Sequence, residues 1–252
     1  MTLHAERVGD GPDLVLLHGW GMHSGVWSEA MPGFAKRCRV HAVDLPGHGN
    51  SSGTAASTLD DAADRVAACV PIGAIICGWS LGGLVAQRIA ARHPGTARAL
   101  VLVSSTPCFV TRPDWPHAMG AATLETFATG LHTDREATLA SFVRLNALHG
   151  VRGREAIRAF TSRLADRGAP SEDSLAASLG WLRDTDLRAH APRLPRTLVI
   201  HGARDALTPV QAARWLATTA PDVVSLELPD AAHIPFFTHR EPFMNALESF
   251  VG

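Results

Sequence analysis

One segment limits the possible folds of this chain more than any other: an apolar run that leads through a glycine-bracketed serine into a helix-length stretch. Residues 74–77 read Ala-Ile-Ile-Cys, residues 78–82 read Gly-Trp-Ser-Leu-Gly, and residues 84–91 are typical of a helix. A serine in this position must sit on a tight turn from strand to helix, and the flanking glycines remove clashes that side chains would create there. The segment therefore predicts that Ser80 is held at the N-terminus of a helix.

Short apolar runs recur along the chain and are followed by stretches of helix length. They occupy residues 14–17, 40–45, 74–77, 99–103, 197–200 and 223–228. Runs bounded by glycine and proline, with helical segments between them, favour a buried parallel sheet with crossover helices. We therefore expect an α/β fold with a mostly parallel, doubly wound sheet. Ligands of such sheets bind beyond the carboxyl ends of the strands, so the loops there are the place to look for chemistry.

The alternation breaks between residues 108 and 188, where amphipathic helical patterns occur without a strand candidate. Turn signals after Gly150 and at Gly168 divide this stretch into several helices. We expect a core formed by residues 1–107 and 189–252, with residues 108–188 inserted as a helical cap over the carboxyl edge of the sheet.

Charge and composition argue against several classes of partner. The formal net charge of -1 provides no global field to hold nucleic acid or an anionic membrane. No apolar run reaches the roughly 18 residues of a membrane span, and residues 1–10 lack the apolar core of a secretory signal. The four cysteines form no CxxC pair, which favours free thiols. We expect a cytoplasmic protein that is a monomer.

A serine hydroxyl is a poor nucleophile without a neighbouring base, which directs attention to the chain after Ser80. Asp205 lies in the sequence HGARDALTP, directly after the run at residues 197–200. His233 lies in the loop after the run at residues 223–228. In hydrolases with this strand-turn-helix motif, the catalytic residues follow each other along the chain in the order serine, acid, histidine. We therefore interpret Asp205 as the orienting acid and His233 as the base.

Other residues compete for these two roles. Asp222 and Asp230 are weaker candidates for the acid because they lie before and after the last strand in turn-like contexts. Asp205 itself could be a solvated or helix-capping carboxylate, and His239 lies at a predicted helix start where it would be solvated. Position and chain order favour Asp205 and His233.

Two backbone N–H groups are candidates for an oxyanion hole. Leu81 follows the serine at the helix N-terminus, where the N–H groups and the helix dipole favour negative charge. Residues 18–21 read His-Gly-Trp-Gly after the first apolar run, and these glycines let the N–H of Trp20 turn inward. We interpret His18 as a structural hydrogen-bonding residue.

The motifs HGWG, DLPGHG and GWSLGG, the Asp205 loop and the His233 loop occur in the order found in the α/β-hydrolase superfamily, which the chain resembles over nearly its full length. The stretches HGWGMHSGVW, GWSLGGLVA, SSTPCF with the following DWP, and AAHIPF are similar to the BioH family. This resemblance implies a serine carboxylesterase that hydrolyses the methyl ester of pimeloyl-acyl carrier protein in biotin synthesis, through an acyl-enzyme on Ser80. It implies neither a metal nor an organic cofactor.

The resemblance also assigns roles to individual residues. The implied catalytic residues are Ser80, Asp205 and His233, and the implied oxyanion donors are Trp20 and Leu81. Phe142 matches a family position that lines the acyl channel, and Trp20 and Trp79 are further candidates for substrate contact. For Trp79 and Phe142 a plain core role is the competing interpretation.

One stretch of the cap, residues 134–167, is locally basic. This stretch carries seven arginines, Arg135, Arg144, Arg152, Arg154, Arg158, Arg163 and Arg167, against four acidic residues, Asp134, Glu136, Glu155 and Asp166. With the family resemblance, this charge suits an acidic acyl carrier protein, and Arg144, Arg154 and Arg158 are the candidate contacts. The alternative is the polar face of solvated amphipathic helices.

Two other functions stay open from the sequence. A general short-chain carboxylesterase would use the same three residues on small-molecule esters without a carrier protein. A hydrolase-fold binding protein or receptor is a further alternative, against which the complete set of Ser80, Asp205 and His233 argues. A dehalogenase would need a carboxylate in place of Ser80. The acyl chain length and the alcohol released are not encoded in these motifs.

Overall fold

The computed structural model describes residues 2–164 and 166–252 and has a seven-stranded sheet at its centre, in the order β1-β3-β2-β4-β5-β6-β7. The strands are β1 (Ala5–Val8), β2 (Asp13–Leu17), β3 (Arg39–Val43), β4 (Ala74–Trp79), β5 (Ala97–Val103), β6 (Arg196–Gly202) and β7 (Val223–Leu228). β1 pairs antiparallel with β3, and the other neighbours pair in parallel. The mostly parallel sheet expected from the apolar runs is confirmed, whereas β1 was not predicted.

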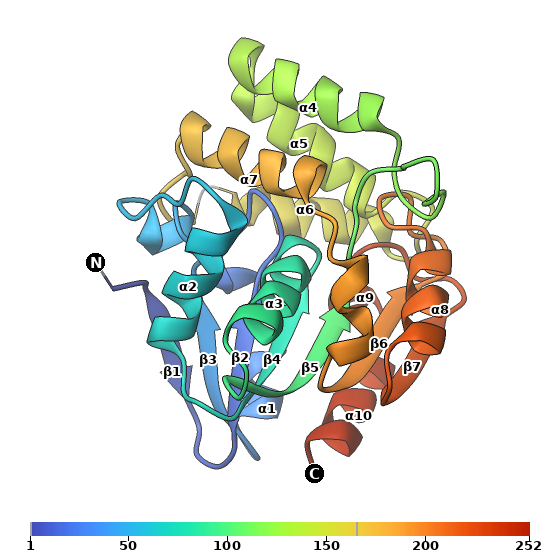
Figure 1. The fold of residues 1–252 in the computed structure, drawn as a ribbon. Coiled ribbons are helices and arrows are strands. Elements are labelled where there is room, and N and C mark those ends of the chain that lie inside the picture. The colour runs from blue at the N-terminus through green and yellow to red at the C-terminus, as the bar shows by residue number, and fades with distance from the viewer. Residues whose placement is uncertain (1, 165) are drawn as a thin grey trace.

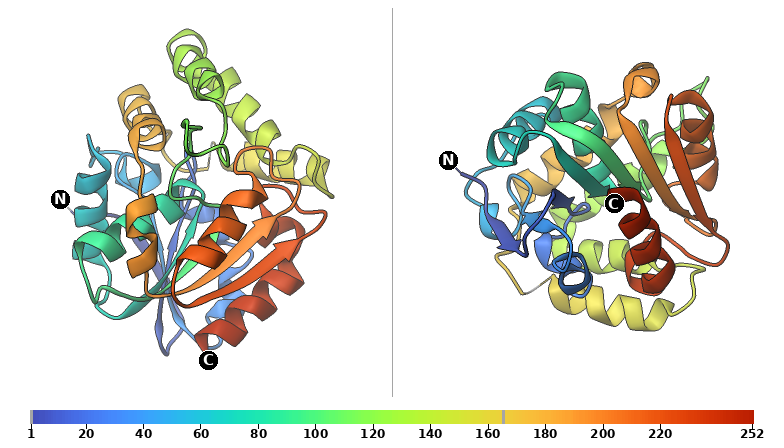
Figure 2. Two further views of the ribbon diagram at one scale, coloured as in Figure 1. Left: turned by 45° about the vertical axis from the view of Figure 1, so that its right-hand side comes forward. Right: turned by 90° about the horizontal axis from the view of Figure 1, so that it is seen from below.

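Helices cover both faces of this sheet (Figure 1, Figure 2). Outside the segment between β5 and β6 they are α1 (Met31–Phe34), α2 (Leu59–Cys69), α3 (Leu81–Arg92), α8 (Val210–Thr219), α9 (Pro235–Thr238) and α10 (Arg240–Val251). Side chains from α2, α3 and α8 pack with one face of the sheet, and those from α1 and α10 pack with the other. This is the doubly wound arrangement, with one apolar core on each face.

Four helices lie between β5 and β6 and extend over the carboxyl ends of the parallel strands (Figure 1). They are α4 (Ala121–Thr133), α5 (Arg135–Asn146), α6 (Gly153–Arg163) and α7 (Glu172–Asp184). We call residues 108–188 the cap, and these bounds remain a prediction. Its first part is not helical: residues 108–120 form a loop with two isolated bridges, and Pro113 and Pro116 lie within it. Proline lacks the N–H that a helix interior requires, which explains this departure from an all-helical insertion.

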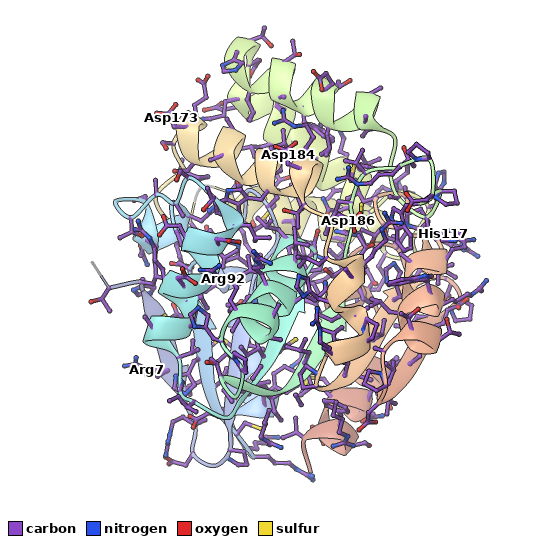
Figure 3. The ribbon with its side chains drawn as sticks, in the orientation of Figure 1. Arg7, Arg92, His117, Asp173, Asp184 and Asp186 are labelled. Carbon is purple, nitrogen blue, oxygen red and sulfur yellow. The ribbon has the colours of Figure 1, made fainter. Side chains whose placement is uncertain are left out.

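The two connections between cap and core are tied to each other. Arg188 forms ion pairs with Asp114 at 2.9 Å and with Asp186 at 2.7 Å. Asp186 lies where the chain leaves α7 (Figure 3). The N–H of Leu187 also donates to the carbonyl of Pro107 at 2.9 Å. The entry and exit of the cap are therefore held side by side. Within residues 2–164 and 166–252, no helix has both the length and the apolar character needed to cross a membrane.

The strand order places a switch point between β2 and β4. From β2 the chain moves to β3 on one side, and from β4 it moves to β5 on the other. Crevices in open α/β sheets form at such a point, because the loops leaving adjacent strands turn in opposite directions. The two loops here contain Trp20 and Ser80.

Candidate active site

Ser80 occupies a strained turn between β4 and α3. Its φ of 54° and ψ of -116° lie outside the regions that side-chain-bearing residues prefer, at a cost of about 1–3 kcal/mol that surrounding contacts must offset. Two such contacts fix its backbone: the Ser80 N–H donates to the carbonyl of Val103 at 2.9 Å, and the Ser105 hydroxyl donates to the Ser80 carbonyl at 2.8 Å. The strand, turn and helix predicted around the serine are all present.

The glycines beside Ser80 are required by close packing. A Cβ at Gly82 would lie 2.5 Å from the carbonyl oxygen of Leu17, and a Cβ at Gly78 would collide with the backbone of Gly82. Both positions must lack a side chain, because backbone atoms cannot move aside as the tip of a side chain can. The turn that carries Ser80 can therefore sit directly against the end of β2.

Asp205 and His233 form a buried pair. Nδ1 of His233 lies 2.7 Å from Oδ2 of Asp205, and neither side chain is more than 1% exposed. An ionised carboxylate can only accept, so Nδ1 carries the proton in this pair and Nε2 is left to act as a base. The loops after β6 and β7 bring the two residues together, as the sequence predicted.

The carboxylate of Asp205 stays ionised in spite of its burial. Burial opposes ionisation, but the imidazole of His233, the nearby His201 and hydrogen bonds together hold the pKa of Asp205 below its ordinary value. The N–H groups of Leu207 and Thr208 both donate to Oδ1 at 2.9 Å. Asp205 is thus a fixed anion beneath His233.

The competing acids lie elsewhere. Asp230 is bound to His239 at 2.9 Å, and the exposed Asp222 uses its backbone carbonyl to accept from Thr197. His239 is more buried than a solvated helix start would be, with 14% of its side chain exposed. Among the described residues, the side chain of neither acid is hydrogen bonded to the ring of His233.

Ser80 and His233 are linked through Trp79 but are not hydrogen bonded to each other. Trp79, the neighbour of Ser80, donates its indole N–H to the carbonyl of His233 at 2.8 Å. Among the described residues no group bonds to Nε2 of His233, the Ser80 hydroxyl included. Ser80 is 3% exposed and His233 is fully buried. Such bonds are often open without a ligand and tighten in the substrate complex.

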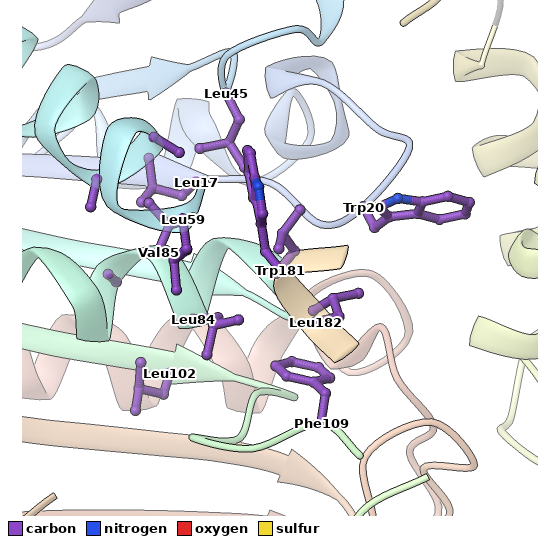
Figure 4. Packing of buried hydrophobic residues seen from close by; sticks show 14 of the residues in the cluster. Leu17, Trp20, Leu45, Leu59, Leu84, Val85, Leu102, Phe109, Trp181 and Leu182 are labelled. Atoms are coloured by element: carbon purple, nitrogen blue, oxygen red, sulfur yellow. The ribbon is translucent and has the colours of Figure 1, made fainter. Parts of the chain in front are cut away.

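The loop after β2 positions Trp20 opposite the start of α3. The turn is closed by the N–H of Met22, which donates to the carbonyl of Gly19 at 3.2 Å, and Nδ1 of His18 lies 2.8 Å from the same carbonyl. Trp20 extends from this loop away from the strands (Figure 4). Leu81 is the first residue of α3, so its N–H has no acceptor within the helix. His18 has the structural role expected of it, since Nε2 accepts from the N–H of Leu45 at 2.9 Å.

Aromatic rings from the core and the cap meet above this loop. The ring of Phe142 in α5 packs edge-on against Trp20 with centroids 4.9 Å apart, and Phe127 in α4 touches both. Trp79 lies in the apolar core on the opposite face of the sheet, where it packs against Phe160 and against the ring of His233. Phe142 and Trp79 thus approach the candidate site from different sides.

Six of the seven arginines in residues 134–167 fall into two groups, and the seventh, Arg135, donates to the carbonyl of Pro170 at 3.4 Å. Three are engaged in ion pairs: Arg152 with Glu155, Arg163 with Glu29 and Arg167 with Glu6. Arg144, Arg154 and Arg158 are exposed, and none has an ion-pair partner among the described residues. Arg144 only contacts the hydroxyl of Ser141, at 3.0 Å. Across residues 2–164 and 166–252 no group of three or more His, Cys, Asp or Glu is arranged to hold a metal ion.

Comparisons with known proteins place this geometry in a family. The sequence profile described as alpha/beta hydrolase fold matches residues 12–240. The chain is 44% identical over 249 residues to the pimeloyl-[acyl-carrier protein] methyl ester esterase of Chromobacterium violaceum, over 98% of this chain and 97% of that protein. It is 40% identical over 250 residues to the protein of the same name from Nitrosomonas europaea, over 98% of this chain and 99% of that protein.

Solved structures share the fold. A bromoperoxidase from Bacillus anthracis matches with a TM-score of 0.91 at 23% identity, over 99% of this chain and 95% of that chain. A hydrolase from Pseudomonas aeruginosa PA01 matches with a TM-score of 0.84 at 28% identity, over 99% of this chain and 94% of that chain. The α/β-hydrolase fold expected from the sequence is therefore confirmed.

Proposed function

The chain belongs to the alpha/beta hydrolase fold family and, within it, to the pimeloyl-[acyl-carrier protein] methyl ester esterases, and on this premise we propose that it hydrolyses the methyl ester of pimeloyl-acyl carrier protein in biotin synthesis. The products are the free pimeloyl carboxylate, still on its carrier, and methanol. The chain is a carboxylic ester hydrolase. We also propose that the protein is located in the cytoplasm and is a monomer.

One observation carries the assignment of catalytic residues: Nδ1 of His233 and Oδ2 of Asp205 are 2.7 Å apart in a buried site beside the strained turn of Ser80. A pair of a histidine and a carboxylate on the protein surface would be solvated and free to reorient. This pair is fixed in one tautomer, with the lone pair of Nε2 available to a serine hydroxyl. The geometry supports Ser80 as nucleophile, His233 as general base and Asp205 as the acid that orients it.

The reaction then proceeds in two steps. The Ser80 hydroxyl attacks the ester carbonyl while Nε2 of His233 takes its proton, and collapse of the tetrahedral intermediate releases methanol with that proton. Water attacks the resulting acyl-enzyme with the same base, which frees the carboxylate and restores the serine. The negative oxygen of each intermediate is stabilised by the N–H groups of Trp20 and Leu81, one from each loop at the switch point of the sheet.

The acyl chain reaches Ser80 along the aromatic rings above the loop after β2, which contains Trp20 and which we call the oxyanion loop. Phe142 and Trp20 are in edge-on contact there, so their ring surfaces supply an apolar wall. Trp79 acts from the other side, because its indole N–H holds the carbonyl of His233 and its ring packs against the imidazole. A pimeloyl chain would meet Phe142 and Trp20 before it reaches the serine.

The carrier protein docks on the exposed arginines of the cap. Arg144, Arg154 and Arg158 are exposed on α5 and α6, and the described residues offer them no ion-pair partner. An acidic partner can bind such groups without breaking an internal ion pair. Charge complementarity of this kind mainly raises the rate of encounter and fixes orientation.

The test is a direct comparison of two substrates. Purified protein is offered methyl pimeloyl-acyl carrier protein and free methyl pimelate, and the rate of ester hydrolysis is measured for each, with Ser80→Ala as the blank. We expect kcat/KM to be much higher for the carrier-linked ester. Equal values would support the general carboxylesterase instead. Absence of turnover on either ester, together with no labelling of Ser80 by a fluorophosphonate, would support the binding protein.

A further inference from the structure

A buried threonine shares the carboxylate of Asp205 with His233. The hydroxyl of Thr208 donates to Oδ2 of Asp205 at 2.7 Å, and Nδ1 of His233 lies at the same distance from the same oxygen. Thr208 is fully buried, directly before Pro209 and the start of α8. Its backbone N–H donates to the other carboxylate oxygen, so one residue holds both oxygens of Asp205.

The direction of the Thr208 hydroxyl is set by a second histidine. Nε2 of His201 lies 2.7 Å from the carbonyl oxygen of Thr208. A carbonyl can only accept, so Nε2 of His201 must carry a proton and cannot accept one from the Thr208 hydroxyl, which lies 3.2 Å away. Nδ1 of His233, at 3.4 Å, is likewise protonated toward Asp205. The carboxylate is the closest acceptor left for this hydroxyl, since the carbonyl of Ser104 is at 3.3 Å.

His201 fixes this arrangement without competing for the charge of Asp205. Its burial lowers its pKa, and the charged or titratable groups that face it are Asp205, His233 and the more distant Glu227 of β7. Nδ1 of His201 has no hydrogen-bond partner among the described residues, so a second proton there would be buried and unpaired. A neutral His201 leaves the carboxylate to Thr208 and His233.

We propose that Thr208 is a positioning residue for the hydrolysis reaction: its hydroxyl fixes the orientation of the Asp205 carboxylate and takes a share of its negative charge, and so sets how firmly Asp205 holds His233. The inference rests on the proposed roles of Ser80, Asp205 and His233. Thr208 acts only through Asp205, because the described contacts place it behind the pair and not beside the ester.

The experiment compares two substitutions at this position. Thr208→Val keeps the shape and the backbone N–H but removes the hydroxyl, whereas Thr208→Ser retains it. With a p-nitrophenyl ester we expect Thr208→Val to lower kcat by about tenfold with little change in KM, because a hydrogen bond to a charged group is lost. The acid limb of its kcat/KM profile should move to higher pH, because a carboxylate with one donor fewer stabilises the imidazolium more strongly. Thr208→Ser should restore both values toward those of the unchanged protein.

A matched control separates positioning from stability. Thr197 is also buried, lies in the same strand as His201, and donates its hydroxyl to the carbonyl of Pro195 at 2.7 Å, at the far end of that strand. Thr197→Val should change the melting temperature alone. Equal kcat and an unmoved acid limb in Thr208→Val, or a Thr208→Ser variant as impaired as Thr208→Val, would overturn the inference. Ser80→Ala is assayed in parallel: if it stays active, the proposed function has failed, and if it is inactive, a normal Thr208→Val disproves only the role of Thr208.

Discussion

The backbone N–H of His233 donates a hydrogen bond of 3.1 Å to the carbonyl oxygen of Asn146, the last residue of α5 in the cap. A second bond joins the same two loops, from the N–H of Val151 to the carbonyl of Asp230 at 3.3 Å. The candidate base is therefore held from below by Asp205 and from above by the cap. Movement of α5 would be transmitted directly to His233, because their backbones are bonded to each other.

This contact predicts that Gly150→Ala lowers turnover more than stability. A Cβ at Gly150 would lie 2.8 Å from Cβ of Ala232, the neighbour of His233, so one of the two loops must shift. Small displacements of a catalytic group can cost about a hundredfold in rate, and we expect kcat to fall by about ten- to a hundredfold. Gly180→Ala in α7 is the control, since its Cβ would meet nothing nearer than 4.0 Å. Equal kcat in both variants would contradict the coupling.

Ser80→Ala should fold normally and lose turnover by about a thousandfold or more, because no other group can form the acyl-enzyme. Removing the hydroxyl leaves the backbone bonds of the turn in place. The check is kcat on a p-nitrophenyl ester, together with mass spectrometry after treatment with a fluorophosphonate. A variant that still turns over or is still labelled would show that another residue is the nucleophile.

Asp205→Asn should be impaired by about ten-thousandfold in kcat, because an amide at this position favours the wrong tautomer of His233. Asp230→Asn provides the matched control, since Asp230 also pairs with a histidine, His239, and also lies in a loop directly after a strand, β7. The second variant should keep nearly full activity. Were Asp230→Asn the more damaging change, the acid would have been assigned to the wrong loop.

Much of the fold could be predicted because its central strands are buried on both sides. The run at residues 74–77 has only apolar residues, and β4 extends it to Trp79. β1 was missed for the opposite reason: its sequence Ala-Glu-Arg-Val is short and half polar, as suits an antiparallel edge strand in contact with solvent. Its pairing depends on β3 being present, which no local pattern encodes.

The residues of the candidate site also fall into those that the sequence predicted and those that it did not. Ser80, Asp205 and His233 could be found because each ends or follows a strand in a recognisable motif. Thr208 and Asn146 could not, although Thr208 lies three residues after Asp205 in the same motif. The bond of Thr208 to Asp205 lies within one loop, but the motif gives its hydroxyl no role. The contact of Asn146 arises only when separate segments meet, because its carbonyl accepts from His233 across 87 residues of chain. Spacing in the sequence carries no signal for such a bond.

Stability should fall steeply as the pH is lowered from about 7 to about 5, because of buried histidines beside the oxyanion loop. Burial lowers the pKa of His18 to about 3 and that of His48 to about 4. The unfolded chain takes up these protons near pH 6.5 and the folded chain does not, so each histidine removes about 1.4 kcal/mol of unfolding free energy per pH unit below that value.

The measurement is urea unfolding across that range. Asp44, which faces His18, has a pKa below its ordinary value and so contributes only at lower pH. His48→Gln should flatten the slope of unfolding free energy against pH by about one histidine's share, because glutamine does not titrate. Its amide can still donate to the carbonyl of Pro46, so the local hydrogen bond is kept. An unfolding free energy that is constant from about pH 7 to about pH 5 would be inconsistent with this origin.

Reversing the exposed arginines of the cap should weaken the reaction with the carrier protein and leave the chemistry intact. The substitutions are Arg144→Glu, Arg154→Glu and Arg158→Glu, made together because an exposed charge pair contributes only about 0–1 kcal/mol. KM for methyl pimeloyl-acyl carrier protein should rise by about tenfold or more, while kcat/KM for a small free ester stays unchanged. Added salt should weaken the reaction of the unchanged protein in the same selective way, since screening acts on separated surface charges and not on the buried pair of Asp205 and His233.

The control reverses three exposed arginines at the opposite edge of the sheet, Arg7, Arg37 and Arg98, which gives the same net charge. If that variant loses as much carrier activity, the effect comes from total charge. Losses on both substrates would mean a damaged cap, and no loss on either would leave these arginines as a solvated helix face.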